Sequence, residues 1–401
     1  MTALNVGSVT LQKGHVQPVW AGHPWVFAQA VERIEGGVTA GDEVVVRDAR
    51  GNALGRGLYS PGSAIPVRIY SRDPDRALDA RFFEERIEEA IKRRRLLDFP
   101  SAETTGFRLL HAEGDALPGL VVDCFNDVLA VQFGTYGVKR REAWILEALQ
   151  RLLSPRAIVD RTTARAAKTE GFQAGEGVIR GQAELSAFEF QERRFQFSIP
   201  LSLGQKTGFY FDQRPLRARV EKLAKGCRVL DAHSYTGAVA LSAARGGAAS
   251  VEAVDTSALA LEVAAETAER NHLLGRVKFE CADAQSVLNH AGNKGGYDLV
   301  ILDPPKLAPS RGKRERALDA MRRLCASGAR ATRPGGILIV SSCSAALGLP
   351  ELTRAVALGA RDVGLGALVL DRLFQGADHP VPAAFPEGLY LSTVITQVSR
   401  L

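Results

Sequence analysis

The sequence predicts an α/β protein whose C-terminal half forms a doubly wound, mostly parallel sheet. Three observations support this fold class from about residue 185 onward. Short apolar strands alternate with alanine-rich helical stretches, several of these strands end at an acidic residue or a small polar turn, and the last strand has no helix after it. The expected strands cover residues 228–230, 251–254, 277–280, 299–302, 337–340 and, as the last and longest, 388–398.

A small β-rich module is expected near the N-terminus. Residues 41–72 contain short apolar alternations separated by Gly, Pro and Asn, which is typical of strands and tight turns. A helix is then expected from about 80 to 97, because apolar residues recur there at helical spacing. The cations Lys92–Arg95 at its end suit the negative end of the helix dipole.

An α+β segment is expected between this helix and the large sheet. Strand-like stretches occur at 119–123 and 128–133, and a helix is expected near 141–153. A chain of 401 residues is also too long for one typical core. We therefore expect three domains, over residues 1–75, 76–185 and 186–401.

Composition narrows the class of protein. The chain is 46% hydrophobic and 24% charged, as soluble globular proteins are. Its first residues lack the features of a signal peptide, and there is no run of about 18 apolar residues, so we expect a cytoplasmic protein. A net charge of +6 is compatible with a polyanionic partner such as RNA.

The five cysteines indicate neither a disulfide framework nor a metal site. Their number is odd, their spacings are wide, and no pair has the C-x₂-C spacing of zinc ligands or redox motifs. We therefore expect no bound metal.

The clearest chemical feature is a carboxylate and a thiol at the ends of two successive strands. Asp303 follows the strand 299–302, and Cys343 follows the strand 337–340 one β-α-β unit later. Ligands of open parallel sheets bind beyond the carboxyl ends of the strands, so both side chains should face one crevice. A thiol and a carboxylate in one crevice suggest covalent chemistry.

The first strand of the sheet predicts the type of cofactor. The stretch after it runs from Asp231 to Gly237 and lacks the G-x-G-x-x-G pattern of dinucleotide folds. An acidic strand end followed by a polar turn suits a ligand with a cationic amino group and no pyrophosphate, such as S-adenosylmethionine. Asp255 and Asp283 end the next two strands, where they can accept hydrogen bonds from the ribose hydroxyls and the adenine amine. For each carboxylate, an N-cap of the following helix is the alternative.

A thiol is needed if the methyl acceptor is carbon 5 of a pyrimidine, which is a poor nucleophile. A thiolate that adds to carbon 6 makes carbon 5 nucleophilic. Asp303 would then hydrogen-bond near N3 of the base, whereas the base that removes the carbon-5 proton is unassigned. Lys306 would lower the pKa of Cys343 or contact a phosphate, or it is a solvated loop lysine. The alternative for Cys343 is a buried structural thiol, an interpretation that fits three other cysteines, Cys227, Cys281 and Cys325.

Several linked motifs now resemble one known family, the bacterial PUA-domain-containing large-subunit (23S) ribosomal RNA cytosine-C5 methyltransferases. The resemblance runs nearly end to end, so it is more specific than any one motif. Its motifs are Gly22–Phe27, His111–Asp123, the K-T-G-F-Y-F-D-Q-R segment at 206–214, Asp303–Lys306, Ser342–Ser344, and residues 377–380 and 386–391.

The resemblance implies a Rossmann-like class I S-adenosylmethionine-dependent methyltransferase sheet, mostly parallel with the last strand antiparallel. It also implies an N-terminal PUA-like RNA-binding domain, a small α+β middle domain, and ribosomal RNA as the partner. Cys343 would be the only catalytic thiol and would act with Asp303. The implied S-adenosylmethionine site consists of Gln213, Asp231, Ser234, Tyr235, Gly237, Asp255, Asp283, Ala284 and Asp303. The residues expected to contact RNA are Lys306, His379, Arg311 and Lys313.

Two departures from the family pattern concern the cofactor. His233 stands where the family usually has Phe, and Thr267 stands where Asn is common. A histidine there changes the polarity of the site and can titrate near neutral pH. Both departures leave cofactor affinity less certain than the fold.

Alternatives stay open for the reaction and the partner. One is methyl transfer to another atom, such as a guanine amine, with Cys343 idle. Another is a non-catalytic RNA-binding assembly factor, while a nicotinamide oxidoreductase is disfavoured by the missing glycine pattern. The basic clusters Lys139–Arg141 and Arg311–Arg316 would hold phosphates or form solvated helix faces. A homodimer also stays open.

Overall fold

The structure is a computed structural model that describes residues 6–182, 184–203, 207–292, 296–306, 314–344 and 347–400. The chain divides into two compact units, which are considered separately below. Unit 1 comprises Met1–Arg194, Gly204–Phe209 and Ala377–Gly388, and unit 2 comprises Phe195–Leu203, Tyr210–Gly376 and Leu389–Leu401. The three-domain boundaries of the sequence analysis stay a prediction.

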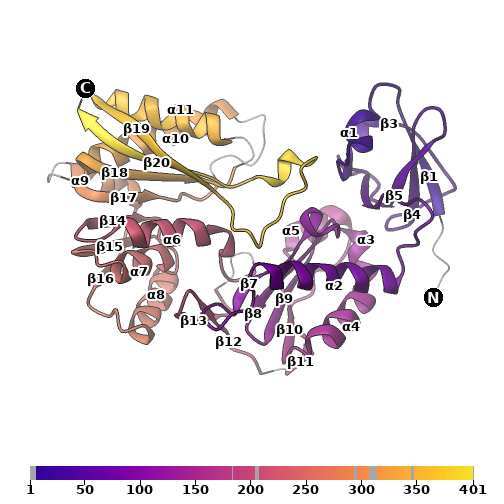
Figure 1. Cartoon of the computed structure of the whole chain (residues 1–401), viewed down its shortest axis with the longest axis horizontal. Coiled ribbons are helices and arrows are strands. Elements are labelled where there is room, and N and C mark those ends of the chain that lie inside the picture. The colour runs from indigo at the N-terminus through magenta and orange to yellow at the C-terminus, as the bar shows by residue number, and fades with distance from the viewer. Residues whose placement is uncertain are drawn as a thin grey trace. The chain divides into compact units, whose positions relative to one another are not determined.

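Unit 2 is built on a seven-stranded sheet in the order β16-β15-β14-β17-β18-β20-β19 (Figure 1). The first five strands are parallel, and β20 is antiparallel to both of its neighbours, β18 and β19. This confirms the predicted fold class. The strands are β14 Arg228–Ala232, β15 Ser250–Asp255, β16 Val277–Cys281, β17 Tyr297–Leu302, β18 Thr332–Ser342, β19 Leu365–Phe374 and β20 Ser392–Arg400. Strand β19 was not predicted, and the last strand begins at Ser392 rather than at the predicted residue 388.

Helices cover both faces of this sheet, with α10 and α11 on one face and α6, α7 and α8 on the other (Figure 1). Aliphatic side chains of the central strands are fully buried between these layers, as expected for a doubly wound sheet. The helices are α6 Arg214–Leu223, α7 Ala238–Arg245, α8 Ala258–Arg270, α9 Ala284–Gly292, α10 Arg314–Ala331 and α11 Leu349–Asp362. Unit 2 also contains strand β13 Phe195–Pro200 and the 3₁₀ turn η3 Phe211–Gln213.

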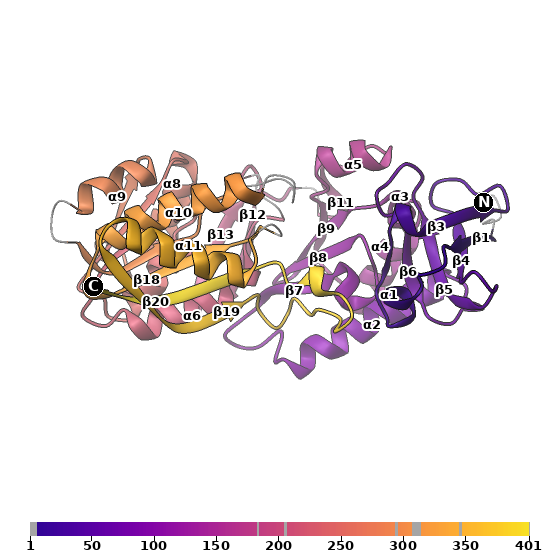
Figure 2. The same ribbon diagram turned by 90° about the horizontal axis from the view of Figure 1, so that it is seen from above.

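Unit 1 contains two sheets (Figure 2). The first has the order β2-β6-β5-β4-β1-β3, and the second has the order β11-β10-β9-β8-β7. The first sheet consists of β1 Val6–Leu11, β2 Trp25–Val26, β3 Val31–Glu35, β4 Glu43–Arg47, β5 Ala53–Tyr59 and β6 Val67–Ser71. The second consists of β7 Gly106–His111, β8 Leu120–Phe125, β9 Val128–Phe133, β10 Ala157–Asp160 and β11 Gly177–Gly181.

The helices of unit 1 follow the predicted pattern, since α2 covers Ala80–Leu96 and α4 covers Glu142–Leu153. Asp79 caps α2 by accepting a hydrogen bond from the backbone N–H of Phe82. The remaining elements are α1 Gln17–Trp20, α3 Tyr136–Lys139, α5 Ala164–Glu170, β12 Ala187–Glu192 and the 3₁₀ turns η1 Ala28–Ala30, η2 Ala112–Asp115 and η5 Pro386–Gly388.

The basic cluster Lys139–Arg141 has a structural role in unit 1. Arg141 is 1% exposed and donates to the carbonyls of Gly41 and Gly137 and to Glu43. Arg140 pairs with Asp42 at 2.7 Å, and Lys139 pairs with Glu142 at 2.8 Å. Because Arg141 is buried, neither a phosphate site nor a solvated helix face describes this residue. Arg140 is exposed and Lys139 is partly exposed, so for these two both interpretations stay predictions.

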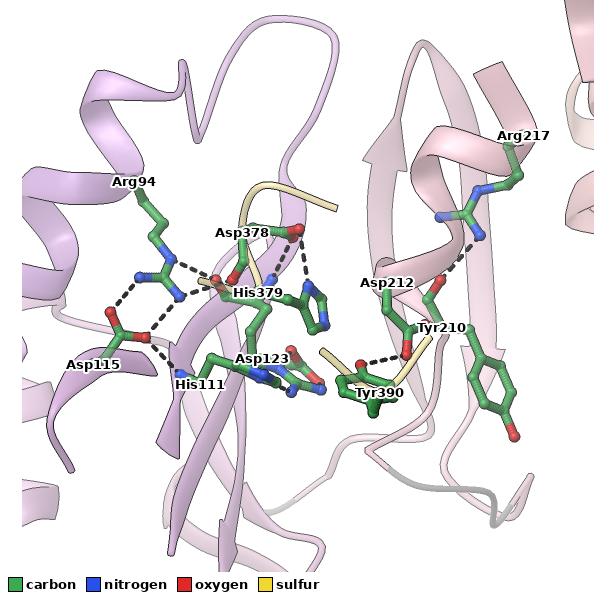
Figure 3. Close-up of polar contacts among 11 residues, drawn as sticks. Arg94, His111, Asp115, Asp123, Tyr210, Asp212, Arg217, Asp378, His379 and Tyr390 are labelled. Atoms are coloured by element: carbon green, nitrogen blue, oxygen red, sulfur yellow. Dashed lines mark hydrogen bonds and ion pairs between the residues drawn. The ribbon is translucent and has the colours of Figure 1, made fainter. Parts of the chain in front are cut away.

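A second buried network ties residues 377–388 to the rest of unit 1 (Figure 3). Arg94 is 1% exposed, holds both oxygens of Asp115 at 2.6 and 2.8 Å, and donates to the carbonyl of Asp378 at 2.8 Å. The Asp378 carboxylate accepts from the backbone N–H of Arg108 at 3.0 Å. The sequence analysis placed Arg94 among cations that complement a helix dipole, whereas its main partners are these buried groups.

Candidate functional site

The predicted carboxylate and thiol lie at the ends of neighbouring parallel strands in unit 2. Leu302 of β17 pairs with Val340 of β18, so Asp303 follows this pair by one residue and Cys343 by three. Both side chains are partly exposed. Serines on either side of Cys343 are buried, and Ser341 hydrogen-bonds to Thr393 of β20 at 2.7 Å. The strand end is therefore fixed by its neighbour, while the thiol itself keeps access to solvent.

Tyr210 lies close to both groups. Burial raises the pKa of its hydroxyl, and the negative charges of Tyr235, Asp212, Asp303 and Cys343 raise it further. The ring of Tyr210 also packs edge-on against Tyr235, with centroids 5.4 Å apart. The sequence analysis did not assign Tyr210 a role. Its position within the motif at 206–214 was the one feature of the sequence that could have marked it as a site residue.

Gln213 reaches Asp303 directly. Its Nε2 donates to Oδ2 of Asp303 at 2.8 Å, and the side chain comes from η3, immediately before α6. The preceding residue, Asp212, is buried and accepts a hydrogen bond from the Tyr390 hydroxyl at 2.7 Å (Figure 3). A buried turn thus presents Gln213 to the carboxylate.

The end of β14 and the turn that follows it carry three buried polar atoms for which no hydrogen-bond partner is found in the described part of the chain. They are Oδ2 of Asp231, Nε2 of His233 and Oγ of Ser234. Buried polar groups normally have partners, so such a cluster points to a polar ligand. Burial raises the pKa of Asp231 to about 8, and the nearby charges of Asp303 and Asp255 act in the same direction. A cationic amino group is the partner that would relieve this carboxylate.

Backbone geometry shapes the same turn. His233, Tyr235 and Gly237 all have φ values in the left-handed region, at 70°, 50° and 71°. A Cβ on Gly237 would lie 2.9 Å from the Cβ of Ala264, so the residue must be small for the turn before α7 to lie against α8. The packing of helices therefore explains this glycine independently of a ligand.

Asp255 and Asp283 both accept hydrogen bonds from backbone N–H groups. The helix-cap alternative fits Asp283 but is wrong for Asp255, because Ser257 is the N-cap of α8. Asp255 accepts from Tyr235 at 2.8 Å and from Ser257 at 2.9 Å, through different oxygens. Asp283 is exposed and accepts from Ser286 at 2.8 Å in the first turn of α9, and Ala284, which begins that helix, is buried. Hydrogen bonds from these carboxylates to ribose and adenine stay predictions.

The two departures from the family pattern have different surroundings. Burial lowers the pKa of His233, so the imidazole is neutral at pH 7 rather than half-titrated, although Asp255 and Asp283 oppose this shift. Thr267 is buried in α8 and donates to the carbonyl of Val263 at 2.7 Å. Its hydroxyl is thus satisfied within its own helix.

The other cysteines only partly match the expected buried thiols. Cys325 is fully buried, and burial raises its pKa to about 12. Cys281 is exposed and Cys227 is partly exposed, so the interpretation of these two as buried thiols is wrong. Both lie at the border of a strand, where the side chain alternates toward solvent.

The residues expected to contact RNA lie in different surroundings. Lys306 is exposed. His379 is 2% exposed, pairs with Asp378 at 3.0 Å and lies edge-on to His111 in unit 1, so its placement does not support contact with RNA. Arg311 and Lys313 lie outside the described residues.

The described residues contain neither a candidate metal site nor a candidate membrane-spanning helix. No group of three or more His, Cys, Asp or Glu side chains is arranged to hold a metal ion. No helix among these residues is both long and apolar enough to cross a membrane.

Comparisons with known proteins agree with this architecture. Residues 9–72 match the model of a PUA-like domain, and residues 107–365 match that of an S-adenosylmethionine-dependent methyltransferase. Ribosomal RNA large subunit methyltransferase I of Pseudoalteromonas translucida is 34% identical over 393 residues, which are 98% of this chain and 99% of that protein. The protein of the same name from Escherichia coli O139:H28 is 34% identical over 388 residues, 96% and 97% of the two chains.

Solved structures show the same fold over nearly the whole chain. SMU.776, described as a methyltransferase and crystallised with SAH, has a TM-score of 0.84 at 19% identity and covers 98% of this chain and 99% of its own. A Streptococcus mutans protein described as a SAM-dependent methyltransferase has the same score and identity, with 97% and 99% covered. The chain thus has a class I methyltransferase fold with an N-terminal PUA-like domain, and it belongs to the S-adenosylmethionine-dependent methyltransferase family that includes these large-subunit methyltransferase I proteins.

Proposed function

We propose that the protein methylates carbon 5 of a cytosine in large-subunit ribosomal RNA through a covalent adduct with Cys343. The supporting observation is the arrangement at the strand ends: a partly exposed thiol follows β18, and Asp303 follows the adjacent strand β17. The names of the relatives support ribosomal RNA as the substrate. Such a substrate also fits the expected cytoplasmic location.

S-Adenosylmethionine supplies an electrophilic methyl group on its sulfonium sulfur. Asp231, Ser234 and His233 would hold the cofactor, because their buried polar atoms still lack partners among the described residues. Asp231 suits its cationic amino group. The neutral His233 can donate or accept a hydrogen bond without placing a second positive charge beside the sulfonium.

The Cys343 thiolate would add to carbon 6 of the extruded cytosine, forming a carbon–sulfur bond. Asp303 would bind near N3, where a proton must be held as the ring gains electron density. Carbon 5 would then take the methyl group, whose bond to the sulfonium sulfur breaks, so that the cofactor leaves as the neutral thioether S-adenosylhomocysteine. Loss of the carbon-5 proton to a base and cleavage of the carbon–sulfur bond release 5-methylcytosine and restore the thiolate.

The test combines a variant with a mechanism-based trap. Cys343→Ala should abolish methyl transfer to ribosomal RNA, while calorimetry should show that S-adenosylmethionine still binds. RNA with 5-fluorocytosine at the target should form a stable covalent adduct with the unmodified protein, because fluorine on carbon 5 prevents the final elimination. Cys281→Ala is the matched control and should retain activity. Substantial turnover by Cys343→Ala would exclude the covalent route and favour transfer to another atom, such as a guanine amine.

A further inference from the structure

The contact between Gln213 and Asp303 joins a buried amide to a partly exposed carboxylate. Gln213 is 6% exposed, and its Nε2 lies 2.8 Å from Oδ2 of Asp303. An ionised carboxylate only accepts hydrogen bonds, so the amide must turn its NH₂ group toward it. This bond engages one oxygen of the Asp303 carboxylate.

The turn that carries Gln213 is held from several directions. Its backbone N–H donates to the carbonyl of Tyr210 at 3.2 Å, and Arg217 donates to the same carbonyl at 3.0 Å (Figure 3). The carbonyl of Asp212 accepts from Gly376 at 3.0 Å, and its carboxylate accepts from Tyr390 at 2.7 Å. Because the neighbouring residue is fixed at both backbone and side chain, Gln213 has little freedom to leave Asp303.

We propose that Gln213 is a positioning residue that orients Asp303 toward the target base, and that Tyr390 supports it through Asp212. The inference rests on the proposed function, in which Asp303 contacts the base. It differs from the role expected from the family resemblance, in which Gln213 contributes to the cofactor pocket.

The charges around Asp303 explain why such a donor is needed. Once a cationic cofactor has ionised Asp231 on β14, that carboxylate and Asp303 act on each other, and in the proposed reaction the Cys343 thiolate adds a negative charge at the end of the adjacent strand. A neutral amide donor stabilises Asp303 among these groups without adding a cation that would repel the sulfonium. Lysine or arginine at position 213 would not meet both requirements.

The first experiment separates positioning from cofactor binding. Gln213→Ala should slow single-turnover methyl transfer by about 10- to 100-fold, the effect of losing one hydrogen bond to a charged group. The dissociation constant for S-adenosylmethionine, measured by calorimetry, should stay within about twofold. A large loss of cofactor affinity with an unchanged single-turnover rate at saturating cofactor would overturn the proposal.

The nearly isosteric variant Gln213→Glu should show a pH dependence that a purely structural role of Gln213 would not produce. Gln213→Glu places a second carboxyl group at hydrogen-bond distance from Asp303, and this group can donate only when it is protonated. The rate of Gln213→Glu relative to the unmodified protein should therefore rise as the pH is lowered from 8 to 6, whereas the relative rate of Gln213→Ala should stay flat. Equal pH profiles for both variants would contradict the positioning role.

The support that Tyr390 gives to Gln213 through Asp212 can be tested with a matched control. Tyr390→Phe removes the hydrogen bond to Asp212 and should slow methyl transfer, by less than Gln213→Ala does. Tyr297→Phe removes a comparable hydroxyl–carboxylate contact, to Glu252, elsewhere in unit 2 and should leave the rate unchanged. Equal rates for the two phenylalanine variants would remove Tyr390 from the proposal.

Failure of the proposed function would be recognised separately. If the unmodified protein forms no adduct with 5-fluorocytosine RNA, the covalent scheme fails whatever the Gln213 variants do. If the adduct forms and Gln213→Ala forms it as fast as the unmodified protein, the positioning role alone fails. Circular dichroism and thermal unfolding of each variant establish that unit 2 is folded.

Discussion

Cofactor binding should expel a proton from Asp231. This side chain belongs to a residue that is 1% exposed, its Oδ2 has no partner in the described part of the chain, and burial raises its pKa to about 8. At pH 7 such a group is about 90% protonated. A cationic amino group favours the ionised form, so we expect about 0.9 protons to be released per S-adenosylmethionine bound at pH 7.

The same linkage sets the pH dependence of affinity. Ionising a group of pKa about 8 costs about 1.4 kcal/mol at pH 7 and about twice that at pH 6. The dissociation constant should therefore fall about tenfold between pH 6 and pH 7. Over this interval the amino group of the cofactor stays mostly protonated, because its ordinary pKa is near 8. The change thus reports on the protein.

Calorimetry in two buffers of different ionisation enthalpy measures the released protons. Asp231→Asn keeps an acceptor oxygen but cannot ionise, so it should release none and bind with a weaker affinity that is constant between pH 6 and 7. Release below about 0.2 protons by the unmodified protein, together with a constant affinity, would refute the argument.

Stability gives an independent check on Asp231. Its pKa is raised in the folded protein from 3.8 to about 8, so the folded state holds a proton that the unfolded state has lost between these values. This contribution to stability is complete below pH 4 and is lost as pH rises toward 8 and above. In the absence of cofactor, the free energy of unfolding should therefore fall less from pH 6 to pH 8 for Asp231→Asn than for the unmodified protein.

Two further predictions concern packing and thiol access. Among the described residues, Arg94→Met leaves the buried Asp115 with Arg93 as its one ionic partner, and it should lower the free energy of unfolding by about 3 kcal/mol in urea titrations. The exposed control Arg95→Met should change this free energy by less than about 0.5 kcal/mol, and equal effects of the two variants would contradict the role of the buried pair. Iodoacetamide should modify the exposed Cys281 in the folded protein and reach Cys325 only after unfolding, since burial raises the pKa of that thiol to about 12. Mass spectrometry that found Cys325 labelled first would contradict its burial.

The sequence predicted correctly those parts of the fold that depend on residues close together in the chain. Continuous apolar runs located the five parallel strands, and the ends of four of them located a carboxylate such as Asp231 or Asp303, whereas the fifth, β18, located Cys343. Strand β19, Leu365–Phe374, escaped because it follows a helix closely and its alternate apolar residues, including Leu368 and Leu370, are exposed. Such a run has the composition of a continuing helix.

Buried charges could not be predicted in the same way. Whether an arginine lies in solvent or in the core depends on a carboxylate that is distant in sequence, as Glu43 is from Arg141. His379 illustrates the same limit, because its burial depends on partners gathered from several segments of unit 1. The hydrogen bond from Gln213 to Asp303 and the closeness of Tyr210 to the same carboxylate likewise became apparent only with the contacts in space.

The network around Arg94 has a consequence for how the protein is made. Asp378, which binds Arg94 and the N–H of Arg108, is synthesised 284 residues after Arg94. A nascent chain that has emerged only to residue 194 therefore contains nearly all of unit 1 but lacks residues 377–388, which complete its buried network. Unit 1 can therefore reach its full stability only when translation is nearly complete. A fragment that ends at residue 194 should accordingly be less stable than unit 1 of the full-length protein.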